Sequence, residues 1–356
     1  MNAGGEDNTY FKGRGAQLNT KNPYLNTEYV AEHPEGIDEA MLENSATQYI
    51  EESPKKVVNK VDSPDLNLMY SLNPYQGCEH GCIYCYARNS HQYWGYSAGL
   101  DFERKIIVKK NAPALLEACF EKKTWAGIPI VLSGNTDCYQ PVERKLKITR
   151  RLLEVFLKYR NPVSIITKNA LILRDLDLLR ELNSLDLVHV SVSLTSLNED
   201  LRQALEPRTV TAKGRLKVIQ NLSAEGIPVR VMTAPIIPGL NSEEIPALIK
   251  AAAEAGASAA GYTLVRLNGA ISQLFEDWVH KSFPDRAQKV LHLISECHQG
   301  KLNDSRFGTR MRGDGNIADM ISKLFHTSVN RYLKGREMRP LNSHAFKRPS
   351  DQLSLF

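Results

Sequence analysis

Short apolar segments alternate with longer amphipathic segments along most of this 356-residue chain. Six short segments have the composition of buried strands: Leu68–Leu72, Pro129–Ser133, Val163–Thr167, Leu187–Ser193, Val229–Ala234 and Ala259–Val265. Helical spacing of apolar positions occurs in the segments between them: Ala112–Lys122, Glu143–Tyr159, Ile172–Leu182, Thr211–Glu225 and Ser242–Ala255. A repeated strand, helix, strand order predicts parallel strands joined by helical crossovers, and therefore an α/β fold.

The regions before and after this repeat differ from it in composition. Residues 1–65 are polar, lack periodic apolar positions and are acidic from Glu28 to Glu52, which predicts a mobile or surface-draped arm. We expect the barrel to occupy residues 66–268, a mainly helical basic cap residues 269–340, and a flexible tail residues 341–356. Between residues 301 and 350 Lys and Arg outnumber Asp and Glu by eleven to four.

Composition excludes several classes of protein. With 42% hydrophobic residues the chain can bury a large core, and six cysteines are too few for a disulfide scaffold. No run of about 18 uncharged apolar residues is present, and no secretory signal opens the chain. We therefore expect a cytoplasmic protein with no membrane span.

Three cysteines, Cys78, Cys82 and Cys85, lie within eight residues in the spacing Cys-x3-Cys-x2-Cys. Three thiolates can bind a cluster of four irons and leave one iron without a protein ligand. The alternative is a zinc site completed by His80 or His91. Structural zinc sites usually take paired Cys-x2-Cys groups with longer separations, so the spacing favours the cluster.

The segment from Asn73 to Arg88, with the aromatic Tyr84 before the last cysteine, resembles the cysteine loop of the radical S-adenosylmethionine (SAM) enzymes. Its flanking residues most resemble the branch that contains spore photoproduct lyase and related DNA repair photolyases. The resemblance implies a partial (βα)6 TIM-type barrel, a [4Fe-4S] cluster and SAM. It also implies reductive cleavage of SAM to a 5′-deoxyadenosyl radical that abstracts hydrogen from a substrate. An external one-electron donor such as flavodoxin or ferredoxin is implied as well.

In such barrels the active site lies beyond the carboxyl ends of the strands. The resemblance assigns SAM contacts to Tyr84, to Ser133, Gly134, Asn135 and Thr136 near the amino group, to Lys168 and Ser193 at the carboxylate, and to Ile237 on the adenine side. An ammonium such as that of Lys168 forms a charge-assisted bond with a carboxylate in a shielded site. The alternatives are a solvated surface lysine and ordinary turn or cap roles for the small polar residues.

Two further motifs are candidates for the site. Arg208, in the segment Glu206-Pro207-Arg208-Thr209, matches relatives in which this segment borders the active site, and it could bind a phosphate or the SAM carboxylate. The alternative is an ion pair that staples the loop. Cys138 is a candidate hydrogen donor, because spore photoproduct lyase uses a cysteine in this region, and Tyr139 is an equally plausible donor. Cys138 does not align with that position.

The C-terminal region suggests partners. Residues 306–315 contain three arginines, a phenylalanine and three glycines, which suits contact with a phosphate backbone, although a solvated basic face has the same composition. The last five residues resemble the peptides by which bacterial DNA polymerases and repair proteins dock on the sliding clamp, through Gln352, Leu353, Leu355 and Phe356. The alternative is that the tail folds back onto the barrel.

Together these features predict a radical SAM enzyme that abstracts hydrogen from DNA in lesion repair, with carbon-carbon lyase chemistry among its outcomes. Two alternatives stay open at this point. One is radical SAM modification of RNA, a peptide or a metabolite. The other is a non-catalytic iron-sulfur or zinc protein that binds nucleic acid.

Overall fold

The computed structural model of the protein describes residues 11–25, 46–66 and 69–348. Its central sheet has the strand order β10-β9-β8-β7-β6-β3-β2. The strands of this sheet are β2 (Val58–Lys60), β3 (Tyr70–Leu72), β6 (Ile130–Leu132), β7 (Val163–Thr167), β8 (Val188–Ser193), β9 (Val229–Ile236) and β10 (Ala259–Leu264). All neighbours are parallel except β2, which pairs antiparallel with β3. The six parallel strands coincide with the six predicted ones, so the partial barrel is confirmed.

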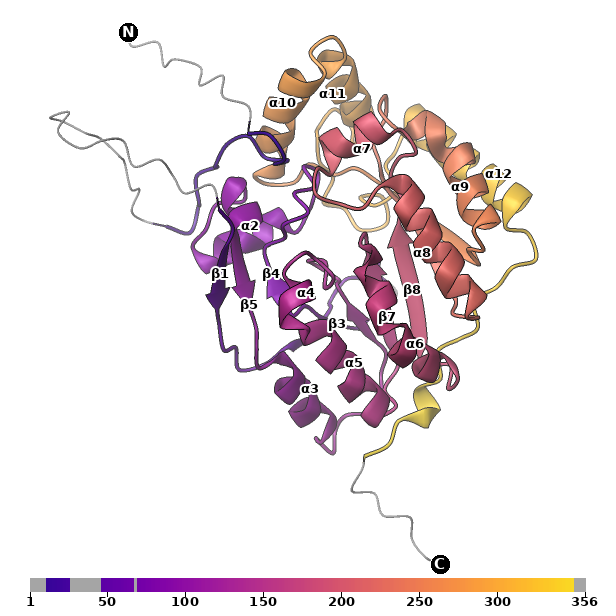
Figure 1. The fold of residues 1–356 in the computed structure, drawn as a ribbon. Helices are drawn as coiled ribbons and strands as arrows, with labels where there is room; N and C mark the ends of the chain where they lie inside the picture. Colours follow the sequence, from indigo (N-terminus) through magenta and orange to yellow (C-terminus); the bar gives the residue numbers. More distant parts are fainter. Residues whose placement is uncertain (1–10, 26–45, 67–68, 349–356) are drawn as a thin grey trace, which may run out of the picture.

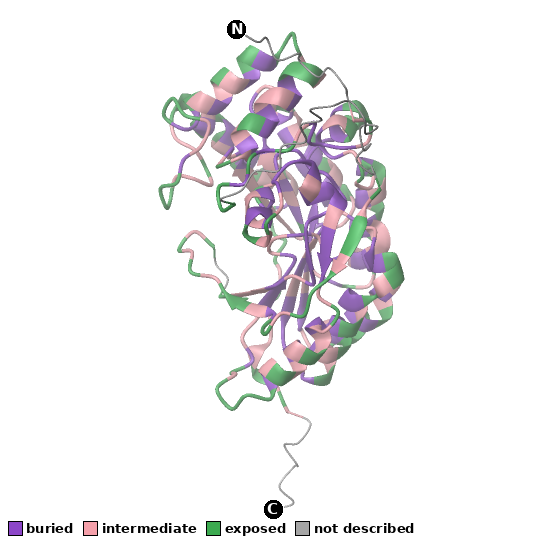
Figure 2. Ribbon diagram, turned by 90° about the vertical axis from the view of Figure 1, so that its left-hand side faces the viewer, coloured by how far each residue is buried: buried purple, intermediate pink, exposed green. Residues whose placement is uncertain are grey.

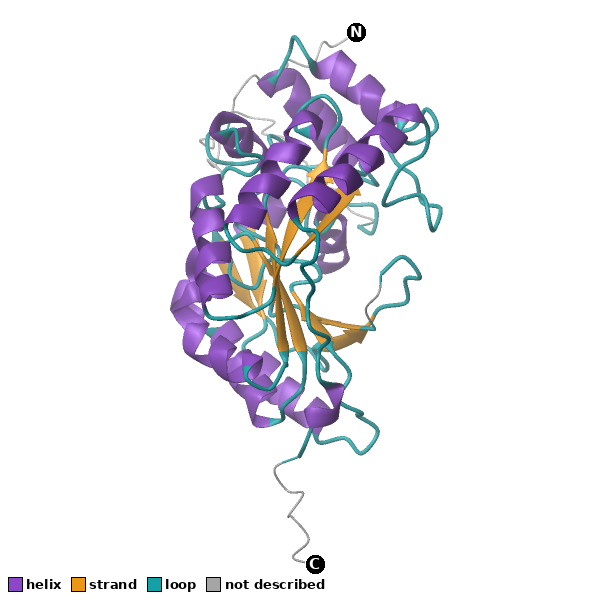
Figure 3. Ribbon diagram, turned by 90° about the vertical axis from the view of Figure 1, so that its right-hand side faces the viewer, coloured by secondary structure: helices purple, strands orange, loops and turns teal. Residues whose placement is uncertain are grey.

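Helices cover the outer face of this sheet, as Figures 1 and 3 show. They are α3 (Ala112–Phe120), α5 (Ile148–Lys158), α6 (Leu176–Asn183), α8 (Ala212–Ala224) and α9 (Ile245–Glu254). In β7 the residues Val163 and Ile165 are buried, while Ile166 lines a cavity on the other face. This alternation follows from the pleat of the strand. Figure 2 shows the resulting buried centre of the sheet.

Two of the predicted helices are each divided into two pieces. Residues 143–159 form α4 (Glu143–Leu146) and α5, separated by Lys147 at φ 51°. The buried carboxylate of Glu143 accepts a hydrogen bond of 3.0 Å from the Thr149 backbone N–H, and so caps the start of α5. Residues 172–182 likewise combine the 3-10 helix η2 (Ala170–Asp175) with α6.

A second, smaller sheet, which the sequence pattern did not predict, brackets the cysteine loop. It consists of β1 (Gln48–Glu51), β4 (Tyr75–Gln76) and β5 (Lys105–Val108), in the order β1-β5-β4. The short helices α1 (Arg88–His91), η1 (Gln92–Trp94) and α2 (Leu100–Arg104) lie between β4 and β5. The three cysteines are therefore held between a strand on one side and a short helix on the other.

The described part of the N-terminal segment differs from the expectation of a mobile or surface-draped arm. Residues Arg14, Ala16, Gln17, Thr20 and Asn22 are buried against the region of the cysteine loop. Gly15 and Ala16 donate their backbone N–H groups to the Glu103 carboxylate at 3.1 and 2.8 Å. This packing combines hydrogen bonds with a few apolar side chains, Phe11, Ala16 and Leu18, that join the cluster around Ile83. These apolar positions are not periodic, which is why the sequence pattern did not predict the packing.

The C-terminal helices have two different positions. Helices α10 (Ile271–Ser282) and α11 (Ala287–Glu296) share an apolar cluster with α7 (Glu199–Leu205) and with Ile83 of the cysteine loop. Helix α12 (Asn316–Tyr332) lies beside α9, and its Phe325 ring packs 4.5 Å from Tyr262 of β10 (Figure 1). Thus α10 and α11 cover the cysteine loop, whereas α12 extends the outer helical layer.

The last described residues run along the opposite end of the barrel. After the 3-10 helix η4 (Ser343–Ala345), Lys347 donates its backbone N–H to the Tyr159 carbonyl, and Arg348 donates to the carbonyls of Phe120 and Lys122. The proposed clamp-binding residues Gln352, Leu353, Leu355 and Phe356 lie outside the described residues. No helix in the described ranges is long and apolar enough to cross a membrane.

Candidate active site

A cavity of about 340 Å³ opens at the carboxyl ends of the parallel strands. Its lining comes from the cysteine loop, from the ends of β6 to β10 and from the segment after β10. It includes Cys82, Tyr84, Cys85, Tyr86, Ser133, Gly134, Asn135, Asp137, Lys168, Ser193, Met232, Arg266, Arg310 and Met311. The structure therefore gathers residues that are far apart in sequence at the end of the barrel where chemistry is expected.

A buried ion pair holds the cysteine loop in shape. The guanidinium of Arg88 donates to Glu103 at 2.5 Å and to the carbonyls of Cys82 and Gly81 at 3.0 and 3.2 Å. At the start of the loop, the Cys78 backbone N–H donates to the Phe102 carbonyl at 2.8 Å. The bonds to the Cys82 and Gly81 carbonyls and from the Cys78 N–H fix backbone at or next to a cysteine, so the loop has little freedom to change shape.

Two glycines make the tight turns of this loop possible. Gly77 and Gly81 have φ values of 79° and 69°, in the left-handed region that favours glycine. A Cβ on Gly81 would lie 2.8 Å from the Glu103 carboxylate, and one on Gly77 would lie 2.9 Å from the Lys105 carbonyl oxygen. A side chain at either position would displace the groups that hold the loop.

The cysteine thiols are shielded from solvent to different degrees. Cys78 and Cys82 are buried, whereas Cys85 is partly exposed toward the cavity. Burial, followed by the nearby Glu206 carboxylate, raises the pKa of Cys82 to about 12. Without metal this thiol therefore keeps its proton, and metal binding must release it.

The donor set fits an iron-sulfur cluster better than a single zinc ion. In the described ranges no three His, Cys, Asp or Glu side chains are arranged to hold one metal ion. A cluster of four irons holds its thiolates farther apart than one ion does. Both ring nitrogens of His80 have other neighbours, Asp137 at 3.4 Å and Asn169 at 3.2 Å, and the His91 ring packs between Tyr96 and Phe102.

Lys168 extends from the end of β7 into the cavity. Its backbone N–H donates to Asp137 at 2.8 Å, and Asp137 also accepts from the Thr167 hydroxyl at 2.9 Å. Burial lowers the pKa of Lys168, but the nearby Cys82 and Glu206 outweigh this effect, so the pKa is raised. No side chain in the described residues pairs with its ammonium group, which therefore stands charged and unpaired beside the cysteines.

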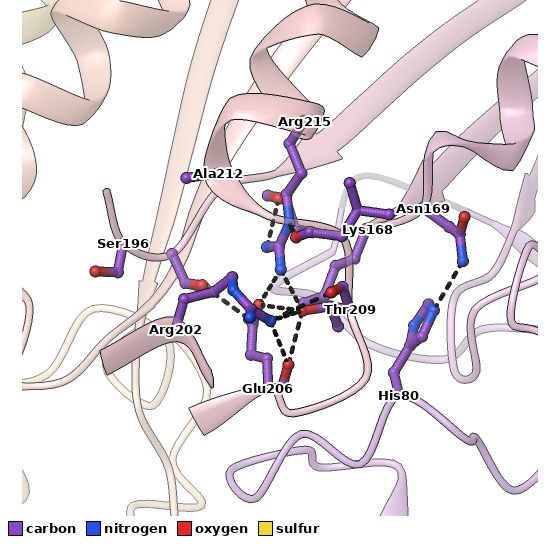
Figure 4. A network of polar contacts seen from close by, with 12 residues as sticks. His80, Lys168, Asn169, Ser196, Arg202, Glu206, Thr209, Ala212 and Arg215 are labelled. Carbon is purple, nitrogen blue, oxygen red and sulfur yellow. Dashed lines mark hydrogen bonds and ion pairs between the residues drawn. The ribbon is translucent and has the colours of Figure 1, made fainter. Parts of the chain in front are cut away.

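A buried network of polar contacts surrounds Glu206, and Figure 4 shows this residue beside Arg215 and Thr209. The Glu206 carboxylate accepts hydrogen bonds from the Tyr84 hydroxyl, from the Thr195 hydroxyl at 2.8 Å and from Arg215. Arg215 also donates to the Ser193 carbonyl at 3.0 Å. Burial raises the pKa of Glu206, but Arg215 and Lys168 outweigh it and lower the pKa to about 2. The ionised carboxylate thus holds the cysteine loop against the end of β8.

Arg215 is a functional residue that the sequence analysis missed. It lies on α8 on the same helical face as Val218, Ile219 and Leu222, all of which are buried. A charged residue on the apolar face of an amphipathic helix is the signal that could have identified it, because burying an unpaired guanidinium is costly.

The segment after β6 is divided between the cavity and the protein interior. Ser133, Gly134 and Asn135 line the cavity. Asn135 is held by hydrogen bonds of 3.1 Å to Gln76 and 3.0 Å to Ser90. Thr136 is buried, donates its hydroxyl to the Tyr75 carbonyl at 2.6 Å and is not part of the cavity wall.

The structure places four other candidate residues away from the cavity. Cys138 and Tyr139 are fully buried in the main core, where the Tyr139 hydroxyl donates to Asp175 at 3.2 Å. They pack behind the cavity wall, so their assignment as hydrogen donors finds no support in this geometry. Ile237 is fully buried, and its backbone N–H donates to Asn241 at 2.6 Å. Arg208 is exposed and donates to the Gly13 carbonyl at 3.1 Å, and so it does not face a ligand in the cavity.

The basic segment 306–315 is also arranged differently from the expectation. Arg306 pairs with Asp304 at 2.8 Å, and Arg310 pairs with Asp65. Arg312 is exposed and has no ion pair among the described residues. Two of the three arginines are therefore paired with carboxylates outside the segment, and Arg310 and Met311 contribute to the cavity wall.

Comparisons with known proteins show the family to which the chain belongs. The sequence profile of the Radical SAM superfamily matches residues 72–252. An uncharacterized protein of Mycobacterium tuberculosis (strain ATCC 25618 / H37Rv) is 32% identical over 242 residues, which cover 67% of this chain and 71% of that protein. An uncharacterized protein of Methanocaldococcus jannaschii is 31% identical over 197 residues, 55% of this chain and 71% of that protein.

Among solved structures, the fold is similar to that of spore photoproduct lyase complexed with dinucleoside spore photoproduct. The TM-score is 0.61 with 15% sequence identity, and the match covers 86% of each chain. A mutant of the same lyase with bound AdoMet and dinucleoside spore photoproduct gives a TM-score of 0.60 with 14% identity and 82% coverage of each chain. Because the family profile matches residues 72–252 and the mycobacterial relative is 32% identical, the chain belongs to the radical SAM superfamily, whose enzymes use a [4Fe-4S] cluster and SAM.

Proposed function

We propose that the cavity holds SAM with its carboxylate beside Lys168, and that the enzyme acts on DNA in lesion repair. The observation that carries the proposal is the unpaired, charged ammonium of Lys168 next to the cysteine loop. A carboxylate is the group that such a cation binds most strongly in a shielded site. Ser193, at the end of the neighbouring strand β8, lines the same part of the cavity and offers a hydroxyl beside it.

The residues of this chain would have different roles in the proposed site. Cys78, Cys82 and Cys85 would hold the cluster. When bound, the cluster and SAM supply a 5′-deoxyadenosyl radical that abstracts hydrogen. The Glu206 and Arg215 pair fixes Tyr84 and the end of β8, which keeps the cofactor pocket in one shape. The apolar cluster of α10 and α11 covers the cysteine loop from the outer side and excludes water there.

DNA is proposed as the substrate for two reasons. A protein with the same fold binds a dinucleoside photoproduct, although at 15% identity the likeness extends to the fold alone. In addition, the rim of the cavity carries arginine and tyrosine side chains, which are the residue types that contact phosphates and bases.

The test uses deuterium to trace the hydrogen atom that is abstracted from the substrate. Anaerobically reconstituted enzyme is incubated with SAM, dithionite and deuterated genomic DNA containing ultraviolet lesions, and the 5′-deoxyadenosine is analysed by mass spectrometry. Deuterium in the 5′-deoxyadenosine would support DNA as the substrate. Unlabelled 5′-deoxyadenosine would contradict it, and label acquired only from deuterated RNA would assign the reaction to RNA instead.

We further propose that the C-terminal motif binds the sliding clamp and that flavodoxin or ferredoxin supplies the electron. Arg348 is anchored to the carbonyls of Phe120 and Lys122, at the end of the barrel opposite the cavity. A clamp held from this end would leave the cavity open to DNA. Replacing Leu355 and Phe356 by alanine should abolish retention on an immobilised clamp, and unchanged retention would overturn the docking proposal.

A further inference from the structure

Arg266 is a cation at the mouth of the cavity for which the described residues provide no partner. It follows β10, is partly exposed and lines the cavity. The other arginine of the cavity wall, Arg310, pairs with Asp65 and donates to the Ser63 hydroxyl at 2.6 Å. Arg266 has neither a hydrogen bond nor an ion pair within the described ranges.

The backbone on both sides of Arg266 is held rigidly. The Val265 backbone N–H donates to the Ile236 carbonyl at 2.9 Å, and the Leu267 backbone N–H donates to the Leu302 carbonyl at 3.0 Å. Asn89 of α1 donates to the Asn268 carbonyl at 2.7 Å and accepts from the Ala270 backbone N–H at 3.1 Å. Arg266 is thus held at a set position relative to the helix that follows the cysteine loop, and a ligand on it would be positioned as well.

The positive charge of Arg266 favours binding of an anion, and the proposed SAM site provides none for it. Burial and the neighbouring Arg310 lower its pKa, but a guanidinium keeps its proton in proteins. A partly buried cation without a partner is costly until an anion binds it. SAM has a single carboxylate, which the proposed function places at Lys168. An anion bound at Arg266 would therefore come from the substrate.

Tyr86 adds an aromatic surface beside this cation. It lines the same cavity, and 53% of its surface is exposed even though its hydroxyl donates to the Gly134 carbonyl. The bond anchors the polar end of the side chain and leaves much of the ring uncovered. An exposed aromatic ring next to a guanidinium is a combination that binds a nucleotide unit, with the base on the ring and the phosphate on the cation.

We propose that Arg266 binds a backbone phosphate of the nucleic-acid substrate and that Tyr86 stacks on an adjacent base. The inference rests on the proposed function, because it assumes that a nucleic acid enters this cavity. The inference goes beyond the proposed function by assigning a substrate subsite at the end of β10, opposite the SAM carboxylate site at the end of β7.

The test measures binding of a fluorescein-labelled single-stranded oligodeoxynucleotide by anisotropy, using reconstituted enzyme with SAM bound. Arg266→Gln should weaken binding about tenfold and reduce the slope of log affinity against log salt by about 1. The matched control is Arg230→Gln, which removes an exposed charge from the start of β9 at the other end of the barrel. This control should bind DNA as the wild type does.

A second probe separates phosphate contact from other effects. With a methylphosphonate oligonucleotide of the same sequence, which has a neutral backbone, wild type and Arg266→Gln should bind equally and more weakly. Tyr86→Ala should reduce binding of both probes about tenfold, and Tyr86→Phe should reduce it less. Equal effects of the two Tyr86 variants would overturn the stacking role.

The outcomes distinguish this inference from the proposed function. If wild type binds DNA and Arg266→Gln behaves like Arg230→Gln, the phosphate site is overturned while DNA remains the substrate. If wild type binds no DNA, both the proposed DNA substrate and the phosphate subsite are overturned. If Arg266→Gln loses SAM affinity in parallel with DNA affinity, Arg266 belongs to the cofactor site and the inference is wrong. Tighter binding of the matching oligoribonucleotide would reassign the same phosphate contact to RNA.

Discussion

Arg88 and Glu103 form an ion pair of 2.5 Å in which neither side chain is exposed to solvent. The pair connects the cysteine loop, through the carbonyls that Arg88 holds, to the N-terminal segment whose backbone N–H groups bind Glu103. Removing one partner of a buried pair leaves the other charge buried without its counter-charge. The stability of this pair and the shape of the metal-binding loop are therefore coupled.

The first prediction concerns this pair. Arg88→Ala should lower the free energy of unfolding by about 3–5 kcal/mol and reduce iron incorporation, because Glu103 loses its counter-charge and two loop carbonyls lose their donor. Urea unfolding and iron content after anaerobic reconstitution measure the two effects. Arg151→Ala, which removes an exposed arginine of α5, is the control and should change neither quantity. Full iron content in Arg88→Ala would show that the loop keeps its shape without the pair.

A second prediction tests the turn between the first two cysteines. Gly81→Ala should destabilise the loop more than Gly95→Ala, although both glycines have positive φ values, 69° and 81°. Both substitutions carry the backbone cost of about 1–2 kcal/mol for an L-residue in this region. Only the Cβ at residue 81 meets another group, the Glu103 carboxylate at 2.8 Å, whereas nothing lies within 4 Å at residue 95. Equal thermal stability and equal iron content of the two variants would contradict this reasoning.

The third prediction separates cofactor binding from cluster binding. Lys168→Ala should weaken SAM binding about tenfold to a hundredfold, as expected for the loss of a charge-assisted hydrogen bond of about 1.5–3 kcal/mol. Its cluster content should stay intact, because Lys168 is not a ligand of the irons. Equilibrium binding of SAM to reconstituted protein measures the effect. Lys213→Ala, on the exposed side of α8, serves as the matched control. An unaltered SAM affinity in Lys168→Ala would contradict the assignment of Lys168 as a contact of the SAM carboxylate.

The fourth prediction concerns pH. The pKa of Glu206 is lowered to about 2 from an ordinary value of 4.5. A carboxyl group with a lowered pKa contributes stability above its unfolded pKa and loses it as the pH falls through the folded pKa. The wild type should therefore lose about 3 kcal/mol of unfolding free energy between pH 4.5 and pH 2 that Glu206→Gln does not lose.

Urea unfolding at a series of pH values measures this difference. Glu206→Gln should already be less stable than the wild type at pH 7, because Arg215 is then buried without its carboxylate. Glu181→Gln, an exposed carboxylate of α6, is the control and should follow the wild-type curve. Parallel curves for wild type and Glu206→Gln below pH 4.5 would show that Glu206 does not carry this pH dependence.

The sequence alone was sufficient to predict the strands of the barrel and many residues of the cavity wall. Strands β3 and β6 to β10 were predictable because burial on a sheet leaves an apolar pattern in the chain. The cysteine loop was predictable because its chemistry depends on local spacing. Lys168 and Ser193 were suggested by the family resemblance, and both line the cavity. They lie close together because the carboxyl ends of parallel strands meet at one edge.

Only the tertiary structure decided which side chains face the cavity and which face the core. Cys138 and Ser133 are five residues apart on one segment, yet Cys138 is fully buried and Ser133 lines the cavity. Arg215 is paired with Glu206, and Arg266 lies in a cavity wall built by distant segments. Arg14 and Ala16 form hydrogen bonds to Glu103. Such contacts depend on where remote parts of the chain meet. Periodicity and spacing record only burial and local geometry, and so they do not specify these partners.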